Sequence, residues 1–529
     1  MKKIYNSNWL FKLKTAAVLC SMLFAGTAMA QLSGTYSIDG GGTGDFTTFT
    51  QLADTLNSDG VSGPVIVNVA AGTYAQNFSI LNVTGLSTTN SLTINGGGAT
   101  ISSSNDVITL RGVSGVNIDN LKIVCNGTSR KNVWIYNGGT ASPSSNISIT
   151  NCELTKPNGS LYATASAYVK IGSGSSFSSN ASQNNTDITI EDNLMHGGST
   201  SSSAGVYCAI SNNHPTSAAA DQNVVIRNND ISGWRYYGVY TRYTSGLLLQ
   251  GNEIHNPANI PQQYKYAIYI YNSDYSSEYA ASEKNVVDKN WIHDLGSSTT
   301  YYYQYGLYYY NYYGYETNDI TNNVFHMNSQ SSIYGISYRQ GYNSGGELNL
   351  IGNTIIDQGD KTYTYNYQRP VYIYYTDVTM KNNIVYCDAD NAYYTYGVYI
   401  YYGPNNVAPV MTHNNIHLEN MTNNGNTWRY AYINGNYNDA DDWLNSTYGA
   451  NSVSVDPNFV DLANSVCIPN SIEMANKAEV NALSTEDITY ATRSTTPDMG
   501  AYEYLVDLEV VSVDMVGGSE CAPWTEEVA

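Results

Sequence analysis

The chain has 529 residues, of which 44 are acidic and 23 basic, and its formal net charge at pH 7 is −21. This balance argues against nucleic acid and anionic membrane surfaces as partners, because both are bound by clusters of Lys and Arg. Only 13% of the residues are charged, and there are 50 Tyr against 8 Phe. This length and composition favour one elongated all-β repeat over several compact domains.

Residues 1–30 have the pattern of a secretory signal peptide. Four Lys residues surround the start of this segment, an apolar run follows at residues 16–25, and residues 28–30 offer a small-residue cleavage site. The run is too short to span a bilayer. We therefore expect export without membrane insertion, a mature chain that begins at Gln31, and a secreted or cell-surface location.

Six cysteines remain in the expected mature chain, and they are too sparse to form a disulfide scaffold. Their spacings match no zinc knuckle, and export would permit disulfides. We expect free buried thiols. The six residues are Cys125, Cys152, Cys208, Cys387, Cys467 and Cys521.

A short amphipathic helix is predicted over residues 45–56, with Asp45 as its N-cap. A helix at this place would cover the open end of a repeat core and hide its exposed strand edge. The apolar residues that share one face of this helix are Phe46, Phe49, Leu52, Ala53 and Leu56.

The middle of the chain repeats a phrase in which an Asn follows an alternating stretch and precedes an apolar residue by two positions. Asn tolerates left-handed backbone conformations at sharp turns, and its amide can donate a hydrogen bond to the equivalent Asn in the next coil. The phrase therefore predicts a ladder of Asn side chains. Its members, spaced 23 to 42 residues apart, are Asn151, Asn193, Asn229, Asn252, Asn290, Asn323, Asn353, Asn383 and Asn414.

A second phrase, rich in Tyr, alternates with the first and has the period of a half-buried strand. Two short strands per repeat cannot bury their apolar faces alone, so the repeats must stack with about 4.8 Å between coils. A propeller or an array of sandwiches would need a longer repeat. The predicted inward positions are Val206, Val239, Ile268, Leu307, Ile336, Val371, Val398 and Tyr432.

Alternation within this second phrase places most of the tyrosines outward, in three columns. The first column comprises Tyr207, Tyr240, Tyr269, Tyr308, Tyr372 and Tyr399, interrupted by Ser337. The second comprises Tyr271, Tyr310, Tyr374 and Tyr401, together with Arg242 and Arg339. The third comprises Tyr237, Tyr266, Tyr305, Tyr334, Tyr396 and Tyr430, with Arg369 in the place of one Tyr.

The Tyr columns allow both a structural and a binding interpretation. Stacked phenol rings stabilise neighbouring coils, and they also form a flat surface that can donate hydrogen bonds to a partner. A contiguous exposed aromatic patch over six or more coils is larger than monomers usually show. The candidate binding residues are Tyr240, Tyr269, Tyr271, Tyr308, Tyr310, Tyr372, Tyr374, Tyr399, Tyr401, Arg242 and Arg339.

Five of the seven histidines occupy one position of the repeat, three residues after the repeated Asn. A stacked imidazole column could bind a metal or supply a general base. The position follows a buried residue and points outward, where His caps backbone carbonyls or stacks on its neighbour, so we predict a structural role. The five residues are His196, His255, His293, His326 and His417.

Two groups of carboxylates are the nearest candidates for a calcium site. One group is Asp388 with Asp390, and the other lies at residues 439–442 just before Trp443. For Asp439, Asp441 and Asp442, capping of a short helix is the simpler interpretation. We expect that the function of this chain requires neither a cofactor nor a bound metal.

The stretches at residues 34–80, 441–461 and 496–504 resemble the start and end of secreted, pectin-lyase-like right-handed parallel β-helix proteins of Bacteroidota-type bacteria. The resemblance implies a right-handed β-helix over residues 31–504, with the short helix as its N-terminal cap. Residues 505–529 resemble the first strands of an immunoglobulin-like module, which implies that the chain is part of a longer surface protein. The pectinesterase motifs QDTL, DFIFG and LGRPW do not occur.

Three functions remain open from the sequence. The first is a non-enzymatic adhesin or extracellular-matrix component whose Tyr-rich face binds a polysaccharide or cell-surface glycan, with its Arg residues meeting acidic sugars. The second, by analogy of fold alone, is a polysaccharide lyase or glycoside hydrolase, and the latter needs two carboxylates about 5 to 10 Å apart in one groove. The third is a purely structural stalk.

Overall fold

The structure is a computed structural model of the chain. It describes residues 31–137, 143–158, 164–172, 184–197, 205–213, 220–258, 264–272, 283–296, 303–311, 317–329, 332–341, 346–358, 367–388, 394–419 and 427–504. The predicted signal peptide (residues 1–30) and immunoglobulin-like start (residues 505–529) lie outside these residues, as do Asp390 and Cys521.

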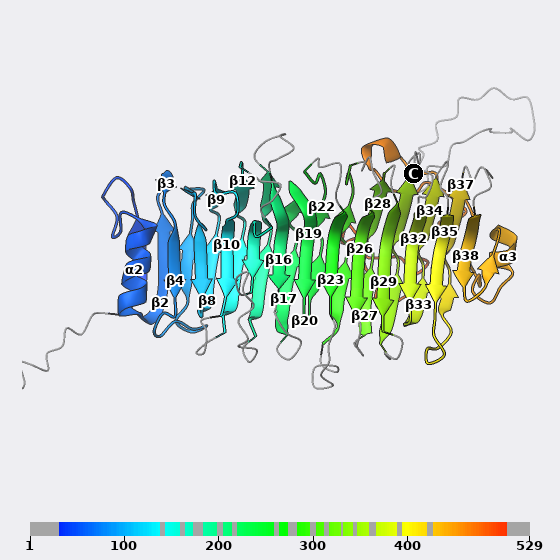
Figure 1. The fold of residues 1–529 in the computed structure, drawn as a ribbon, viewed down its shortest axis with the longest axis horizontal. Helices are drawn as coiled ribbons and strands as arrows, with labels where there is room; N and C mark the ends of the chain where they lie inside the picture. The colour runs from blue at the N-terminus through cyan, green and yellow to red at the C-terminus, as the bar shows by residue number, and fades with distance from the viewer. Residues whose placement is uncertain are drawn as a thin grey trace, which may run out of the picture.

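The described residues form an elongated parallel β-helix in which successive coils add one strand to each of three sheets (Figure 1). Sheet A, with fourteen strands, comprises β1 (Leu32–Ile38), β2 (Val61–Val69), β5 (Leu92–Asn95), β8 (Ser114–Asp119), β11 (Ser145–Thr150), β14 (Thr186–Glu191), β17 (Asp221–Arg227), β20 (Thr244–Ser245), β21 (Leu248–Gln250), β24 (Asn285–Asp288), β27 (Thr317–Thr321), β30 (Glu347–Ile351), β33 (Asp377–Lys381) and β36 (Val410–Thr412). Sheet B, with twelve strands, comprises β3 (Thr73–Ala75), β6 (Thr100–Ser103), β9 (Lys122–Cys125), β12 (Glu153–Lys156), β15 (Leu194–Gly197), β18 (Asp230–Ile231), β22 (Glu253–Ile254), β25 (Trp291–Ile292), β28 (Val324–Asn328), β31 (Thr354–Gln358), β34 (Ile384–Asp388) and β37 (Asn415–Glu419). Sheet C, with thirteen strands, comprises β4 (Phe78–Leu81), β7 (Ile108–Arg111), β10 (Lys131–Tyr136), β13 (Ala167–Ile171), β16 (Val206–Asn213), β19 (Trp234–Arg242), β23 (Lys265–Tyr271), β26 (Gln304–Asn311), β29 (Ile333–Gln340), β32 (Tyr367–Tyr374), β35 (Tyr394–Tyr401), β38 (Thr427–Ile433) and β39 (Asn436–Tyr437).

The core is a set of apolar columns that run along the axis between the three sheets. On sheet C, residues paired across neighbouring strands form one such column, and each of its members is fully buried. Because every strand repeats the same alternation, one register places all of these side chains inside. The column consists of Val133, Val169, Ile210, Val239, Ile268, Leu307, Ile336, Val371, Val398 and Ala431.

Two of the predicted inward residues were wrong for this column. Val206 is fully buried, as predicted, but it pairs with Trp234, and Ile210 is the residue that pairs with Val239. At the other end Ala431 pairs with Val398, and Tyr432 pairs with Tyr399 on the outer surface. A slip of one residue moves a side chain to the opposite face of its sheet, so Tyr432 belongs outside.

The Asn ladder is present, at the corner that leads into sheet B. In each step the amide oxygen of one Asn accepts hydrogen bonds from both the backbone N–H and the side-chain amide of the Asn in the coil before it, at 2.9 to 3.1 Å. Each side chain also donates to a backbone carbonyl, as Asn323 does to Val287 at 2.8 Å. The ladder runs through Asn193, Asn229, Asn252, Asn290, Asn323, Asn353, Asn383 and Asn414.

Asn151 was wrongly assigned to this ladder. The backbone N–H of Cys152, not of Asn151, donates to the Asn193 amide oxygen at 3.0 Å, so Cys152 occupies the ladder position in that coil. Asn151 instead has φ = +52°, so it makes the left-handed turn just before the ladder position. The left-handed residue precedes the ladder residue: Asn120, Asn151, Asp192, Asn228, Gly251, Lys289, Asn322, Gly352, Asn382 and His413 all have positive φ.

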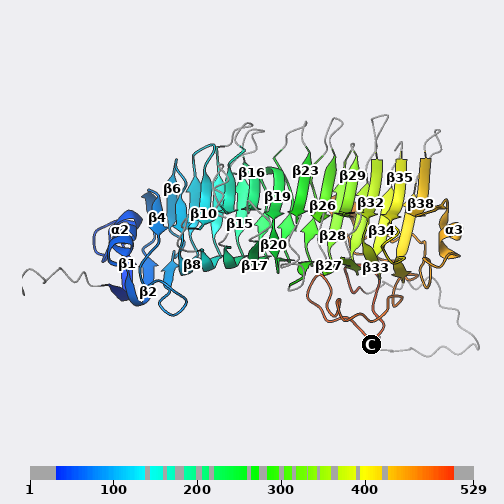
Figure 2. The same ribbon diagram turned by 60° about the horizontal axis from the view of Figure 1, so that its bottom comes forward.

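The helix α2 (Phe49–Asp59) closes one end of the coils, as the sequence predicts, but it starts later than expected (Figures 1 and 2). Thr48 is its N-cap and accepts from the backbone N–H of Gln51. Asp45 instead accepts from the backbone and hydroxyl of Ser37. Phe49 stacks on Phe78 with the ring centroids 5.2 Å apart, so the helix seals the first coil through aromatic packing.

The coils end near β38, where the helix α3 (Ala440–Leu444) follows β39 and buries Trp443. The predicted capping role of residues 439–442 is confirmed, since Asp439 is the N-cap and accepts from the backbone N–H of Asp442. The chain then returns along the outside of earlier coils through the 3₁₀ helix η2 (Leu462–Asn464) (Figure 2). We call residues 445–504 the return segment.

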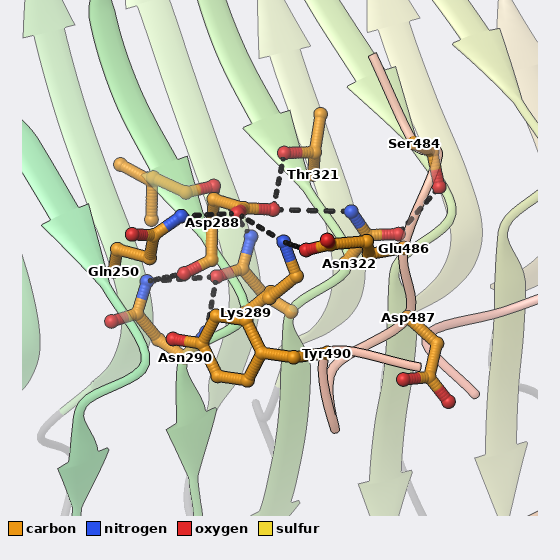
Figure 3. A network of polar contacts seen from close by, with 12 residues as sticks. Gln250, Asp288, Lys289, Asn290, Thr321, Asn322, Ser484, Glu486, Asp487 and Tyr490 are labelled. Carbon is orange, nitrogen blue, oxygen red and sulfur yellow. Dashed lines mark hydrogen bonds and ion pairs between the residues drawn. The ribbon is translucent and has the colours of Figure 1, made fainter. Parts of the chain in front are cut away.

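The return segment is fixed to the corner between sheets A and B by a polar network (Figure 3). Asp288 accepts from Gln250 (2.9 Å), Thr321 (2.7 Å) and Lys289 (2.9 Å), and Lys289 also lies 3.5 Å from Glu486 of the segment. The side chains of both Asp288 and Lys289 are more than nine-tenths buried. A buried ion pair of this kind requires all its partners, so the network specifies where the segment docks.

The five cysteines that the structure describes are free and buried, which confirms the predicted thiols. They are Cys125, Cys152, Cys208, Cys387 and Cys467. No helix within the described ranges has the length and apolar character needed to cross a membrane.

Candidate functional site

Strand pairing on sheet C aligns the outward tyrosines into columns. The first column continues beyond the predicted residues at both ends: Lys170 and Ser211 precede Tyr240, and Tyr432 follows Tyr399. Tyr207 does not belong to it, because Ser211 is the residue of β16 that pairs with Tyr240. The aligned residues are Lys170, Ser211, Tyr240, Tyr269, Tyr308, Ser337, Tyr372, Tyr399 and Tyr432.

The second and third columns lie on either side of the first. The second aligns as predicted, with cations among the tyrosines: Arg242, Tyr271, Tyr310, Arg339, Tyr374 and Tyr401. The third differs at its end, where Arg429, rather than Tyr430, pairs with Tyr396. Its members are Tyr237, Tyr266, Tyr305, Tyr334, Arg369, Tyr396 and Arg429. We call the outer surface of these three columns the Tyr face.

Rings of the Tyr face stack within columns and meet edge-on between them. The Tyr240, Tyr269 and Tyr308 rings follow one another at centroid distances of 5.2 and 5.0 Å, with interplanar angles under 20°. Tyr266 meets Tyr269 at 87° and a distance of 5.1 Å. Such pairs contribute about 0.5–1.5 kcal/mol each beyond the area they bury. Packing between the rings therefore fixes the geometry of this surface in the unbound protein.

The hydroxyl groups of Tyr240 and Tyr334 on the Tyr face are held in the protonated form. Burial between neighbouring rings raises the pKa of Tyr240 to about 12, although the Arg242 guanidinium opposes this shift. Burial likewise raises the pKa of Tyr334 to about 12, against the opposing charge of Arg369. At neutral pH these groups are therefore neutral, and each can both donate and accept a hydrogen bond.

Arginines of the Tyr face lie over its rings. The Arg369 guanidinium is 4.7 Å from the Tyr372 ring centroid, 4.9 Å from that of Tyr367 and 5.5 Å from that of Tyr399. Arg242 lies 5.5 Å from the Tyr271 centroid, and Arg339 lies 5.7 Å from that of Tyr310. These contacts hold each cation on the surface without neutralising its charge.

Acidic side chains are missing from this sheet although the whole chain is strongly acidic. The strands of sheet C contain no Asp or Glu, whereas Asp or Glu recurs along the strands of sheets A and B. Within the described ranges, no carboxylate forms an ion pair with Arg242, Arg339 or Arg369. The basic residues of these strands are Arg111, Lys131, Lys170, Arg235, Arg242, Lys265, Arg339, Arg369 and Arg429.

A cavity of about 230 Å³ opens at one end of the Tyr face. Lys170 of β13 lines it opposite Tyr237 and Tyr240 of β19, and Ser166 and Asn213 add polar groups. Burial lowers the pKa of Lys170, and the charge of Lys131 lowers it further. The cavity thus combines an ammonium group, aromatic walls and hydrogen-bonding side chains, which suits a small anionic group.

The histidine column is paired mainly with carboxylates rather than with backbone carbonyls. His196 contacts Glu153 at 3.1 Å, and His255 contacts Asp230 at 2.8 Å. The His255 and His293 rings stack at 5.2 Å, which agrees with the predicted stacking. Burial lowers the pKa of His326, a shift that its contact with Gln358 opposes only in part. The sequence analysis did not recognise that carboxylates of the preceding coil, such as Glu153 and Asp230, would be the partners of these histidines.

Four residues of the Tyr face were missed in the sequence: Lys170, Ser211, Tyr432 and Arg429. Lys170 lies in the alternating stretch at residues 167–171, which continues the strand phrase one coil earlier. In the last coil, Tyr430 was predicted in the third column and Tyr432 was predicted to lie inward, but Arg429 and Ala431, one residue earlier in each case, hold those places. The cavity beside Lys170 could not be predicted from alternation, because its lining depends on how side chains of β13, β16 and β19 pack against one another.

Comparisons with known proteins concern the fold. A family model described as "Right handed beta helix region" matches residues 183–355. No curated protein matches the chain. The chain is similar to a solved structure titled "Crystal structure of pectate lyase Pel9A", at 10% sequence identity and a TM-score of 0.39, over 90% of this chain and 98% of that one. With its three parallel sheets, the chain is a right-handed parallel β-helix.

Proposed function

We propose that this protein is a non-enzymatic β-helix that binds an acidic polysaccharide along the Tyr face, as a secreted or cell-surface component. The observation that carries the proposal is the composition of sheet C: stacked outward tyrosines, most of them partly exposed, with interspersed arginines and no acidic residue on any of its strands. The rings would stack on the faces of sugar rings and bond to their hydroxyls, and the arginines would meet carboxylate or sulfate groups.

The length of the face supports a polymer rather than a small molecule. The first column continues from Tyr240 on β19 to Tyr432 on β38, with Ser337 as its one non-aromatic position along that span. The cations recur along the same span, at Arg242, Arg339 and Arg369. A linear polyanion could therefore contact several of them at once, and such repeated weak contacts add up to useful affinity.

Binding without cleavage is supported by the same surface. Glycoside hydrolysis needs a pair of carboxylates beside the sugar, and elimination from a uronic acid needs acidic ligands for calcium together with a base. In the described part of sheet C neither set of groups is present. The alternative of a lyase or hydrolase would therefore have to place its chemistry on another surface.

An array of acidic and neutral polysaccharides tests the proposal directly. The purified chain is compared with a triple variant carrying Tyr269→Thr, Tyr308→Thr and Tyr372→Thr, in which Thr keeps the strand propensity but removes the rings. We expect the signal on polyuronates or sulfated polysaccharides to fall at least tenfold. Soluble products are measured in the same wells, where we expect none.

The control replaces tyrosines that are not members of the three columns, with Tyr36→Thr on β1 of sheet A and Tyr437→Thr on β39, which pairs with the inward Ala431 at the end of sheet C. Circular dichroism must show that both variants retain β structure. If the triple variant binds as well as the parent, the Tyr face serves only to stabilise the coils. If the parent releases unsaturated or reducing sugars, the protein is an enzyme and the proposal is wrong.

A further inference from the structure

Sheet B carries a group of metal-ligating side chains that the proposed function does not use. Glu253 of β22, His255 just after it and His293 just after β25 each offer a ligand atom, and these atoms lie within 4.8 Å of one another. The residues come from two neighbouring coils, in which Glu253 pairs with Trp291 and Ile254 pairs with Ile292. The repeat itself therefore brings them to one place.

His293 has a carboxylate at both of its ring nitrogens. Its Nδ1 lies 2.9 Å from Asp294 and its Nε2 lies 3.0 Å from Glu253. A neutral imidazole carries one N–H, so it can satisfy only one of these two contacts. The second contact requires another cation between nitrogen and oxygen, which is either a proton or a metal ion.

The arrangement around His293 matches the way proteins orient a metal-binding imidazole. Asp294 accepts at Nδ1 and is itself held by the Ser465 hydroxyl of the return segment at 3.1 Å. A carboxylate at one nitrogen fixes the tautomer and leaves the lone pair of the other nitrogen for a metal. Here that free lone pair points toward Glu253, a second ligand.

Charge and access also favour a divalent ion at this place. Asp230, Glu253 and Asp294 surround two imidazoles, and among the described residues the ion pairs of these carboxylates are with histidines alone. The Glu253 side chain is 39% exposed, which leaves it free to move toward the two rings. The ligand atoms already lie within 4.8 Å of one another, and His293 Nε2 and Glu253 Oε1 are 3.0 Å apart. A tetrahedral site spaces its ligand atoms about 3.3 Å apart, so the atoms need to approach by at most about 1.5 Å.

We propose that Glu253, His255 and His293 bind one divalent transition-metal ion of the Zn²⁺ type, with Asp294 as the residue that orients His293. Two imidazoles and one carboxylate are a ligand set that zinc accepts with a fourth position open to water or to a partner's side chain. The ion would join two coils on sheet B. This site does not depend on glycan binding by sheet C.

The test measures Zn²⁺ binding by calorimetry on tag-free chain stripped of metal with a chelator. All variants carry His417→Gln, because His417, Glu419 and Asp456 form a second group with ligand atoms in reach of one another. In this background we expect one Zn²⁺ per chain. His293→Gln and Glu253→Gln should each weaken Zn²⁺ binding at least tenfold. Co²⁺ should show a tetrahedral ligand-field spectrum with the background protein and lose it with either substitution.

The matched control is His196→Gln in the same background, since His196 occupies the same position of the repeat and also contacts a glutamate, but forms no such three-residue group with the residues that the structure describes. It should bind Zn²⁺ like the background. Thermal melting without metal shows whether each variant is folded. If His293→Gln does not fold, Glu253→Gln still tests the site, because its Gln keeps an acceptor for His293. Failure of the background to bind Zn²⁺, or equal binding by the folded variants, overturns the proposal.

Discussion

Asn recurs at the ladder position from Asn193 to Asn414 because its amide both donates and accepts in one plane. The oxygen of Asn323 accepts from the backbone and side chain of Asn290, both at 2.9 Å, while its nitrogen donates to Asn353 at 2.9 Å and to the Val287 carbonyl at 2.8 Å. Every one of these groups is buried, so each needs its partner. A hydroxyl or an acid cannot supply the same set of contacts.

Asn323→Ala should therefore lower the free energy of unfolding by about 2–4 kcal/mol, because several buried polar groups lose their partners. Chemical denaturation measures the change. The control is Asn95→Ala, which removes an exposed bond to Asn68 on sheet A and should cost less than about 0.5 kcal/mol. Equal losses in the two variants would show that the ladder contributes no more than a surface contact.

His326 makes stability depend on pH. It lies under the return segment, between Ser465 and Gln358, and burial lowers its pKa below the ordinary value of 6.5. The unfolded chain then binds the proton more tightly than the folded chain. Stability contributed by the neutral ring is complete above pH 6.5 and is lost as the pH falls from there toward the folded pKa.

Between pH 7.5 and 5.5, the parent should lose more stability than His326→Gln, by at most about 1.4 kcal/mol per pH unit. Urea titrations in the presence of a chelator measure the difference. His255→Gln gives the opposite sign: burial opposes its protonation, but the hydrogen bond and charge of Asp230 outweigh this and raise the pKa of His255. If both variants followed the parent, neither imidazole would contribute to the pH dependence.

Helix α2 protects the first coil from pairing with another chain. Phe49 is fully buried, stacks on Phe78 and meets Tyr74 edge-on at 5.3 Å. Phe49→Ala should cost about 3–5 kcal/mol and uncover the strand edge beneath the helix. We expect a lower melting temperature and concentration-dependent association in light scattering. A variant that stays monomeric with the parent's melting temperature would contradict the capping role.

The return segment depends on the buried pair of Asp288 and Lys289. Asp288→Ala removes the acceptor for Gln250, Thr321 and Lys289, and leaves a buried ammonium group paired with Glu486 alone. Loss of one member of a buried pair costs about 3–5 kcal/mol. Limited proteolysis should then cleave within residues 445–504 much faster than in the parent.

The control for the return segment is Asp187→Ala, which removes an exposed contact with Asn223 on sheet A. Its proteolysis should match that of the parent. Equal protection of the segment in both variants would show that the apolar contacts alone hold it in place.

The sequence was sufficient for the architecture because the repeat constrains it many times over. Each coil repeats the alternation, so an error at one position, such as Val206 or Asn151, left the rest of the register correct. The return segment was missed because its path depends on contacts such as Lys289 with Glu486, which lie far apart in the sequence. Such contacts leave no periodic pattern.

The Tyr face was predictable to the extent that it follows from alternation. Tyr269, Tyr308 and Tyr372 lie outward as expected, and strand pairing aligns the cations with them. What alternation could not give is the environment of each group, for example the five rings within 6 Å of Arg369. The cavity beside Lys170 likewise results from packing between strands.

Attraction between an acidic protein and a polyanion must be local, since the net charge of −21 opposes it. Raising NaCl from about 50 to 500 mM shortens the screening length to a few ångströms. Affinity for an acidic polysaccharide should therefore fall at least tenfold at high salt, and Arg369→Gln should reduce both affinity and salt dependence. Affinity electrophoresis measures both, and salt-independent binding would exclude the arginines as contacts.

The most direct measurement is a crystal structure of the chain with an acidic oligosaccharide bound. We predict that the sugar lies across the strands of sheet C, over Tyr269, Tyr308 and Tyr372, with its acidic groups beside Arg339 and Arg369. Density for the sugar on sheet A or sheet B, with the Tyr face unoccupied, would contradict this account of the surface.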